Sequence, residues 1–416
     1  MKKPELLAPA GNMEKMRMAY NYGADAVYLG LDKFNLREKA DNFTYERLEK
    51  ALKYAKSLNK KLYVTLNILP KNKDLNEIGK VLDELNNIKP DAVIIADIGL
   101  IGMAKKHASN IDIHVSTQAN IMNVESAKTF CQMGAKRLIL ARELSLKEVA
   151  EIKEAVGNEH EIEVFVHGSM CVSYSGRCLL SSYMASRDAN YGDCAQPCRW
   201  RYALVEEKRP GKYYPIYEDE KGTYILNSKD LKMIDYMEDL YNSKIDSFKI
   251  EGRMKSVFYV ASVTKAYRDA IDDYYQSPSL YKDKLDYYNE LVSMASHRQY
   301  TSAYGIEDDL DMTEKTQNAM HYGTSSYTRD YLYAGLVLDY DHDSGLAFIH
   351  EANPVFLGDD IILMSPKKGK YIQKVTFLAD EEMTPIEQAH HPAMKYYMKT
   401  DYPLEKDTIL IKEVAK

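Results

Sequence analysis

Four cysteines lie close together in one short segment of the chain. Cys171, Cys178, Cys194 and Cys198 fall within 28 residues at the spacing C-x6-C-x15-C-x3-C, and Cys131 is the one cysteine elsewhere in the sequence. Four thiolates from one segment make a ligand set for a soft metal centre. An iron–sulfur cluster tolerates such varied cysteine spacing. The segment therefore favours a cluster, most simply a [4Fe–4S] centre.

Two other interpretations of the cysteines stay open. Structural zinc usually takes pairs at C-x2-4-C spacing, which Cys194 and Cys198 satisfy and the wider first pair does not. Buried packing cysteines are common singly, and four in one segment argue against that reading. Four protein thiolates would leave no iron vacant, so a cluster here suits electron transfer or structural support better than direct substrate binding. The three-cysteine arrangement of radical enzymes is absent, and radical chemistry is not predicted.

The elements that must position these cysteines alternate regularly over the first 250 residues. Amphipathic stretches such as 45–58 and 74–87 carry apolar residues at i, i+3, i+4 and i+7, which is typical of helices. Between them stand eight short apolar runs: ELLAP, DAVYLGL, KLYVTLN, DAVIIAD, IDIHVST, RLILARE, EIEVFVHG and DSFKIEG. Such runs are typical of parallel strands covered by helices. An α/β fold with a (β/α)8 TIM-like barrel is predicted. An open doubly wound sheet is the alternative, weakened because no G-x-G-x-x-G follows the first strand.

One long interruption places the cysteines in this scheme. The seventh run ends at Gly168 and the eighth starts at Asp246, so residues 168–245 form a cysteine-rich insertion, with one helix expected over 228–241. The C-terminal ends of barrel strands carry the active site in this fold. The insertion should therefore lie on the catalytic mouth.

The rest of the chain divides into three further parts. Helices are expected from about 255 to 295, which completes a barrel domain over 1–300. Residues 301–330 read as an irregular linker. Alternating strands separated by turns such as DHDSG and PKKGK predict a small, barrel-like β-domain over 331–416.

Composition limits the functional class. The 416 residues are 45% hydrophobic and 28% charged, which is typical of a globular protein. No apolar run approaches the ~20 residues needed to cross a bilayer, and MKKPELLAPAGN lacks the apolar core of a signal peptide. A cytoplasmic location is expected, where clustered cysteines serve metal or redox chemistry rather than disulfides. The net charge of −7 counts against general affinity for nucleic acid but not against a local basic face.

Several polar residues stand where predicted strands end. His167, four residues before Cys171, could move protons, and Glu251 ends the eighth strand; these two are the predicted catalytic residues. His114, Gln118 and Asn67 occupy similar positions, with a functional role less favoured. The alternative for each is a structural, hydrogen-bonded side chain or an ion pair.

Longer motifs around the cysteines resemble a known family. EVFVHGSMCVSYSGRC and GDCAQPCRWRY are similar to the collagenase-like peptidase family of unassigned catalytic type, and the likeness extends to ELLAPAGNMEKMRMAYNYGADAVYLGL, FNLREKADNF, FKIEGRMKS and SHRQYTSAYG. It covers nearly the whole chain. Many members resemble RNA or quinone hydroxylases. The form with one C-terminal β-domain is similar to the branch that makes 5-hydroxyuridine at the wobble position of tRNA, with an iron–sulfur cluster and prephenate.

The resemblance implies a division of roles. The cluster ligands would be Cys171, Cys178, Cys194 and Cys198. Because prephenate has two carboxylates and arginine holds carboxylates bidentately, its candidate ligands are Arg177, Arg187 and Arg253. Arginine and aromatic side chains suit stacking and phosphate contacts, and the candidates for tRNA are Arg199, Trp200, Arg201, Lys367 and Lys368, with Lys370, Lys395 and Lys399 nearby. Structural ion pairs and solvated turns are the alternatives. The electron donor or partner protein is not indicated.

Other functions remain as alternatives. A peptidase of the same family would need its own machinery, but H-E-x-x-H and G-x-S-x-G are absent. Cys131, in TFCQMGAKRLIL, falls on a predicted core helix with no evident base. A hydroxylase of rRNA or another substrate, and an accessory scaffold that binds a cluster or RNA without catalysis, are the remaining possibilities.

Overall fold

The fold is described from a computed structural model of the chain. The structure describes residues 2–36, 41–171, 173, 175–200, 217–219, 222–224, 228–302, 305–306 and 328–414.

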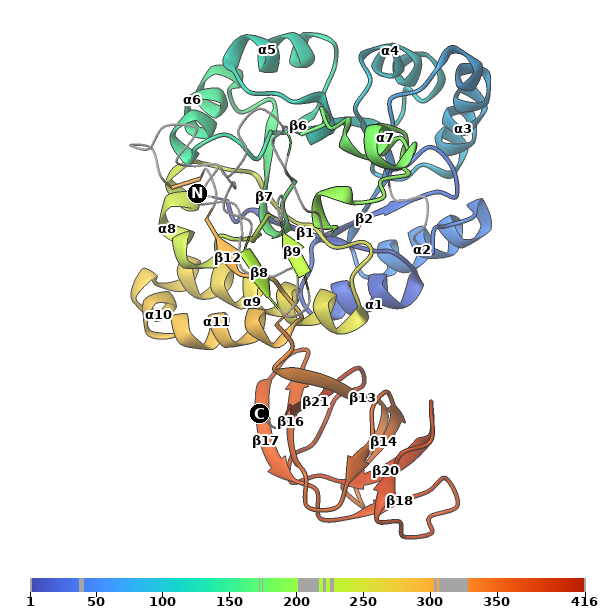
Figure 1. Ribbon diagram of the computed structural model, residues 1–416, viewed down its shortest axis with the longest axis vertical. Coiled ribbons are helices and arrows are strands. Elements are labelled where there is room, and N and C mark those ends of the chain that lie inside the picture. The colour runs from blue at the N-terminus through green and yellow to red at the C-terminus, as the bar shows by residue number, and fades with distance from the viewer. Residues whose placement is uncertain are drawn as a thin grey trace.

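Eight parallel strands close into a barrel, as predicted (Figure 1). Each strand pairs with the next, and the eighth pairs with both the first and the seventh. Every strand coincides with one of the eight apolar runs of the sequence. The strands are β1 (Glu5–Pro9), β2 (Ala26–Gly30), β3 (Lys61–Leu66), β4 (Ala92–Ile95), β5 (Asp112–Val115), β6 (Arg137–Ile139), β7 (Glu161–Ser169) and β11 (Ser247–Ile250).

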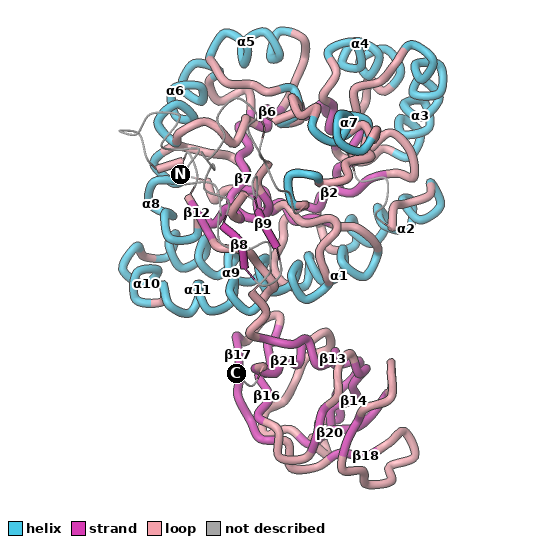
Figure 2. The backbone as a smooth tube through the Cα atoms, in the orientation of Figure 1, coloured by secondary structure: helices cyan, strands magenta, loops and turns pink. Residues whose placement is uncertain are grey.

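Helices surround the barrel and cover its outer face (Figure 2). Most of them begin at a side chain that caps free backbone N–H groups; Asn12, Thr44 and Ser145 cap the first, second and sixth. The helices are α1 (Met13–Asn21), α2 (Tyr45–Ser57), α3 (Leu75–Ile88), α4 (Ile98–His107), α5 (Val124–Gln132), α6 (Leu146–Val156), α8 (Met237–Asn242), α9 (Val257–Gln276), α10 (Pro278–Asp283) and α11 (Leu285–Met294). The expected helices at 45–58 and 74–87, and the helical region after 255, are confirmed.

Both faces of the barrel strands are buried, which explains why the strands read as continuous apolar runs. Outward residues join the large core shared with the helices. Inward residues, among them Tyr28, Tyr63 and Phe165, fill the barrel itself.

The insertion contains α7 (Leu180–Ala185), the short turns η3 (Ala189–Tyr191) and η4 (Pro197–Arg199), and the paired strands β8 (Tyr217–Asp219) and β9 (Gly222–Tyr224). The single helix expected over 228–241 is wrong. Its first part is strand β10 (Asp230–Lys232), followed by η5 (Ile234–Tyr236) and α8. The reason is tertiary: β10 adds antiparallel to the end of β7 and parallel to β12 (Tyr300–Thr301), so its backbone bonds are taken by a sheet.

The C-terminal part is a separate antiparallel sheet with its own core. The strands missed by sequence reasoning are short or, like β20, carry lysines at their ends. The sheet comprises β13 (Tyr331–Asp341), β14 (Leu346–Glu351), β16 (Asp360–Ser365), β17 (Gly369–Lys374), β18 (Leu378–Ala379), β20 (Lys395–Lys399) and β21 (Ile409–Glu413), and β15 (Val355–Phe356) pairs with β19 (Gln388–Ala389).

This sheet docks against the first barrel helix and its neighbours. The Tyr22 hydroxyl contacts the carbonyl oxygens of Met364 at 2.7 Å and Asp407 at 2.9 Å, and Arg17 pairs with Asp407 at 3.1 Å. The domain boundaries at 300 and 330 stay predictions, because 303–304 and 307–327 lie outside the described residues. No helix in the described part of the chain is long and apolar enough to span a bilayer.

Candidate active site at the barrel mouth

The cysteine segment lies across the C-terminal mouth of the barrel, as predicted, and two glycines let it approach closely. Gly176 has φ +76°, and a Cβ there would lie 2.1 Å from the carbonyl oxygen of Gln118, which follows β5. Gly192 has φ +103°, and its Cβ would lie 2.6 Å from the carbonyl oxygen of Asn35, which follows β2. Residues with side chains would force the segment away from the barrel.

Hydrogen bonds tie the segment to two further strand-end loops. The Tyr191 hydroxyl donates to Asp74 at 2.8 Å, and the carbonyl oxygen of Asn190 accepts from the backbone of the loop after β3. The Ser175 backbone N–H donates to Glu143, in the loop after β6, at 2.9 Å. The segment is therefore held by the loops after four strands.

The two ends of the insertion are pinned together at β7. The Ser228 hydroxyl donates to the Met170 carbonyl oxygen at 2.9 Å. Arg298, the arginine of the SHRQY motif, is buried. It donates to the Ser228 carbonyl oxygen at 2.7 Å and pairs with Asp230 at 3.3 Å. This arginine thus fixes the return of the chain to the sheet.

The four thiols lie on this segment in differing environments. Cys171 is exposed and the other three are partly buried. A hydrogen bond between Cys171 and Cys178 lowers the pKa of Cys178 and raises that of Cys171. The backbone N–H groups of Leu180 and Ser181 further lower the pKa of Cys178. These donors favour a thiolate, the form that binds metal.

The thiols fit an iron–sulfur cluster in their donor chemistry. The Cys194 sulfur accepts a backbone N–H from Gln196 at 3.4 Å, and Cys198 is close enough to Cys171 to affect its pKa. Among the described residues, no three His, Cys, Asp or Glu side chains converge on one point in a metal-binding geometry. The segment thus brings soft ligands to the mouth without gathering them around a common centre.

A small cavity of about 60 Å³ lies at the C-terminal ends of the strands, and the loops that hold the segment contribute Leu36 and Gln118 to its lining. It contains two residues predicted from the sequence, Glu251 and Arg253. Its other lining residues are Tyr28, Leu36, Thr65, Asn67, Ile94, Ser116, Thr117, Gln118, Arg142, Phe165 and Lys249. Asn67 and Gln118 therefore do reach the mouth.

Arg253 is anchored within this cavity. It is 3% exposed, and its guanidinium donates to Asn35 at 2.5 Å and to Thr65 at 3.3 Å. Gly30 leaves room for it, since a Cβ there would lie 2.0 Å from its terminal nitrogen. The other two predicted prephenate ligands lie elsewhere in the insertion: Arg187 is occupied by Asp193 at 2.6 Å, and Arg177 is exposed.

Sequence reasoning missed two cations of the cavity, Arg142 and Lys249. Arg142 follows β6, and its guanidinium stands 4.0 Å from the Phe165 ring centroid. Lys249 lies within β11, and its ammonium is 2.9 Å from Glu163. The sequence offered a sign of each: Arg142 is a charged residue near the end of the apolar run RLILARE, and Lys249 is a lysine inside the strand of DSFKIEG.

A buried ionic network continues from Lys249 through the barrel interior. Glu163 pairs with Arg137 at 2.9 Å, and Arg137 also pairs with Glu161 and Glu5, each at 2.6 Å. Burial alone would raise the pKa of Glu5, but Arg137 lowers it on balance. Charged residues thus link the N-terminal end of the barrel to its mouth.

His167 does not reach the mouth, which argues against its predicted catalytic role. An irregularity in the pairing of β7 with β11 places His167 opposite Ile250 rather than continuing the inward series of Glu163 and Phe165. Its ring packs among Tyr259 and Tyr267 of helix α9 and Tyr300 of strand β12. Burial lowers its pKa well below the usual value, so the imidazole is neutral.

His114 is also a buried, structural histidine. It packs edge-on against Tyr63 with ring centroids 4.7 Å apart, inside the barrel. Burial, with help from Arg137 and Lys249, lowers its pKa well below the usual value.

The predicted RNA-binding residues are spread over two surfaces. Trp200 is 43% exposed beside the last cysteine, Arg199 ends η4, and Arg201 lies outside the described residues. Lys367 and Lys368 are exposed in the turn between β16 and β17. Lys370 instead pairs with Glu290 of α11, and Lys399 donates to the Ser344 carbonyl oxygen.

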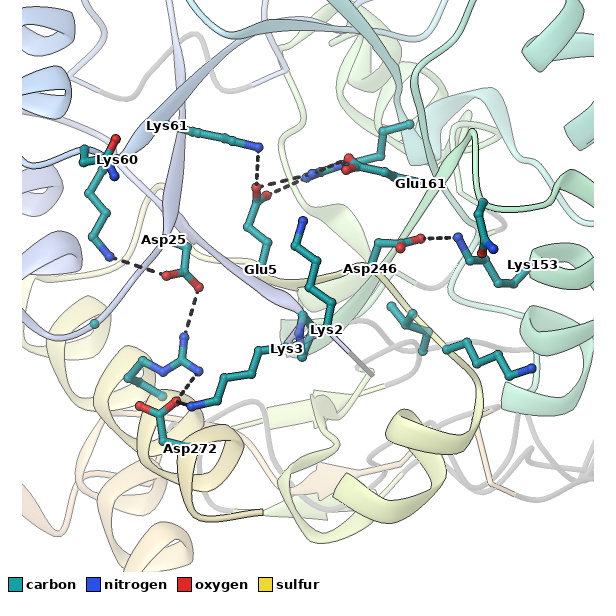
Figure 3. Close-up of a pocket in the computed structure, with 18 residues that line it drawn as sticks. Lys2, Lys3, Glu5, Asp25, Lys60, Lys61, Lys153, Glu161, Asp246 and Asp272 are labelled. Atoms are coloured by element: carbon teal, nitrogen blue, oxygen red, sulfur yellow. Dashed lines mark hydrogen bonds and ion pairs between the residues drawn. The ribbon is translucent and has the colours of Figure 1, made fainter. Parts of the chain in front are cut away.

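A larger cavity of about 810 Å³ occupies the opposite, N-terminal end of the barrel (Figure 3). Most of its cations are matched by carboxylates: Lys153 pairs with Asp246 at 2.7 Å and Lys3 with Asp272 at 2.8 Å. In barrels of this type the N-terminal face serves stability. The mouth, with its thiols and cations, is therefore the candidate active site.

These features define the chain as a (β/α)8-barrel protein with a thiol-bearing segment over its active-site face. Two family models match it: Peptidase family U32 over residues 11–315 and the Peptidase family U32 C-terminal domain over residues 329–410. The chain belongs to peptidase family U32.

Three curated relatives show the range of names within this family. The tRNA hydroxylation protein P1 of Bacillus subtilis is 36% identical, covering 96% of this chain and 92% of the relative. The tRNA hydroxylation protein P of Escherichia coli is 38% identical, covering 88% and 87%. A protein of Porphyromonas gingivalis named collagenase is 31% identical, covering 92% of each.

Proposed function

We propose that this protein hydroxylates a uridine of tRNA, forming 5-hydroxyuridine at the wobble position. The observation that carries the proposal is the packing of the thiol segment on the loops after β2 and β5, which contribute Leu36 and Gln118 to the cavity that Glu251 and Arg253 also line. The relatives named for tRNA hydroxylation, which align over most of their own length, support it. A cluster held by Cys171, Cys178, Cys194 and Cys198 would supply an electron-transfer centre at this mouth.

The protein's own residues would bind and orient the substrates. Prephenate is proposed as co-substrate, and Arg253 is the predicted arginine that the structure places in the cavity. Hydrogen bonds to Asn35 and Thr65 hold the guanidinium in a fixed orientation, which suits carboxylate recognition. Glu251 lines the same cavity and could accept a proton there.

A tRNA anticodon loop already presents unstacked bases, so the target base can approach without melting a helix. Trp200 offers an exposed ring beside the mouth for stacking. Because the chain has a net charge of −7, phosphate contacts must come from local cations such as Lys367 and Lys368.

The peptidase alternative has less support from the site. Cys131 is the one described cysteine outside the segment, so a separate cysteine nucleophile would have to be this residue. Burial raises the pKa of its thiol. A raised pKa is the opposite of what a cysteine nucleophile needs.

The test is to delete the gene and measure 5-hydroxyuridine and its derivatives in total tRNA by mass spectrometry. Deletion should abolish these nucleosides, and the wild-type gene or Cys131→Ala should restore them, whereas Cys171→Ala should not. Unchanged nucleosides, together with peptide cleavage that survives loss of bound iron, would establish the peptidase function instead.

A further inference from the structure

Lys249 is a buried lysine whose side chain lines the mouth cavity. Its side chain is 4% exposed, and its ammonium donates one hydrogen bond, to Glu163 at 2.9 Å. The ammonium also lies 4.6 Å from the Tyr28 ring centroid. Because Tyr28 and Lys249 both line the mouth cavity, the ammonium is placed where a ligand in that cavity can accept its remaining N–H groups.

Arg142 lies close by on the same aromatic support. The Phe165 ring centroid is 4.0 Å from the Arg142 guanidinium and 5.3 Å from the Lys249 ammonium. One Arg142 nitrogen donates to the Ser169 carbonyl oxygen at 2.8 Å, while its buried Nε has no partner among the described residues. Two cations are thus held beside one ring, where each disfavours the charge of the other unless an anion lies between them.

The charges that line the cavity are unbalanced. Arg142, Lys249 and Arg253 contribute three positive charges, and Glu251 is the one carboxylate among the described lining residues. Burial lowers the pKa of Lys249 and Glu163 opposes this change, while Arg137 and Arg142 lower the pKa further. Glu163 balances Lys249 from outside the lining, so the cavity keeps an excess of positive charge, and its three cationic side chains offer donors for both carboxylates of a dianion.

Glu163 fixes the direction of the Lys249 ammonium. One of its oxygens binds Lys249, and the other accepts from Arg137 at 2.9 Å and from Ser247 at 3.2 Å. Arg137 is in turn held by Glu5 and Glu161. One oxygen of Glu163 is therefore held by Arg137 and Ser247, while the other holds the Lys249 ammonium in place beside the cavity.

We propose that Lys249 and Arg142, together with Arg253, bind the carboxylates of a small organic dianion at the mouth cavity, and that Glu163 is the positioning residue for Lys249. The inference rests on the proposed function in taking this mouth as the active site and prephenate as the test ligand. It adds two ligand-binding residues to which the sequence analysis gave no role.

The experiment is calorimetric titration of the full-length, metal-loaded protein with prephenate, which has two carboxylates, and with phenylpyruvate, which has one. Wild type should bind prephenate more tightly. Lys249→Met and Arg142→Met should each weaken prephenate binding by about tenfold to a hundredfold, as expected for a hydrogen bond between charged groups, and should reduce the preference over phenylpyruvate.

The matched control is Lys153→Met. Lys153 is also a buried lysine, 7% exposed and paired with a carboxylate at 2.7 Å, but it lines the cavity at the other end of the barrel (Figure 3). Its loss should leave prephenate binding unchanged. If Lys249→Met does not fold, Arg142→Met carries the test, because Arg142 is only partly buried.

Glu163→Gln tests the positioning role by its pH profile. Without the carboxylate, the pKa of Lys249 should fall further, so prephenate binding should be lost at a lower pH than in wild type. A binding profile that is weaker but unshifted would overturn this role.

The inference and the proposed function can fail separately. Unaltered prephenate affinity in both Lys249→Met and Arg142→Met, or no binding by wild type, would overturn the inference while tRNA hydroxylation still stood. Prephenate binding that depends on both residues in a protein with no effect on tRNA would support the inference and reject the function.

Discussion

The backbone N–H of Glu251 donates to the carbonyl oxygen of His167 at 2.9 Å, yet the two side chains face opposite layers of the barrel. Glu251 lines the mouth cavity, whereas His167 packs among tyrosines on the helix side. Of these two residues at neighbouring strand ends, Glu251 is available to a substrate and His167 serves packing.

The neutral state of the buried histidines makes stability depend on pH. In the unfolded chain His114 and His167 would take up protons below the ordinary pKa of 6.5, but burial keeps both neutral in the folded state. Acidification therefore favours unfolding. Each should cost about 1.4 kcal/mol of unfolding free energy per pH unit below about pH 6.5, until its own folded-state pKa is reached.

Urea unfolding at about pH 7.5 and about pH 5 measures this dependence. His167→Gln should lose less stability on acidification than wild type, while His342→Gln, which removes an exposed imidazole, should behave as wild type. Equal pH dependence in all three proteins would contradict the buried neutral state.

Metal content should follow the segment cysteines and not Cys131. Cys171→Ala and Cys178→Ala should lose iron, sulfide and visible colour after anaerobic purification, because each removes a thiolate of the proposed cluster. Cys131→Ala should keep all three. A colourless wild type with one tightly bound zinc would replace the cluster by the zinc interpretation.

The close approach of Gly176 to the Gln118 carbonyl oxygen should affect iron content more than the positive φ of this glycine does. Gly176→Ala would place a methyl group 2.1 Å from the Gln118 carbonyl oxygen and displace the cysteine segment. Gly157→Ala has a similar φ, +71°, but meets no atom within 4 Å. Lower iron content in the first variant, with near-normal content in the second, is the expected result.

Arg137 should be a major determinant of stability. Arg137→Met removes the shared cation of Glu5 and Glu163 and leaves them, among the described cations, only Lys61 and Lys249, and it should cost about 3–5 kcal/mol in urea unfolding. Lys50→Met, which breaks an exposed pair with Glu46, should have no measurable effect. Similar stabilities for the two variants would refute the importance of the interior network.

Trp200 should contribute to RNA affinity. Loss of a stacking ring typically costs about 1–3 kcal/mol, so Trp200→Ala should weaken tRNA binding about fivefold to a hundredfold in filter binding. Tyr45→Ala removes an aromatic ring of comparable exposure, 39%, from α2 and should not change it. Equal losses would indicate a general surface effect.

The barrel could be predicted from sequence because its strands are buried on both faces, which leaves a repeated apolar signal. The position of the cysteines followed from chain order, since the seventh strand ends just before Cys171. Glu251 and Arg253 could be predicted in the same way, because they directly follow the eighth strand.

Other features depend on contacts that no local pattern records. The change of facing at His167 arises from an irregular register against β11, and β10 becomes a strand because the end of β7 offers it a partner. The sequence marks Lys249 and Arg142 as charges in or after apolar strands, but only the closed barrel brings them to one ring.

The attachment of the cysteine segment to the loops after β2, β3, β5 and β6 bears on the order of assembly. These loops come together only once the barrel has closed, so the segment can settle over the mouth only late in folding. A chain whose barrel stays open would display its four thiols separately to solvent, where they are exposed to oxidants instead of being offered to a metal. Metal uptake should therefore report on barrel closure in the whole molecule.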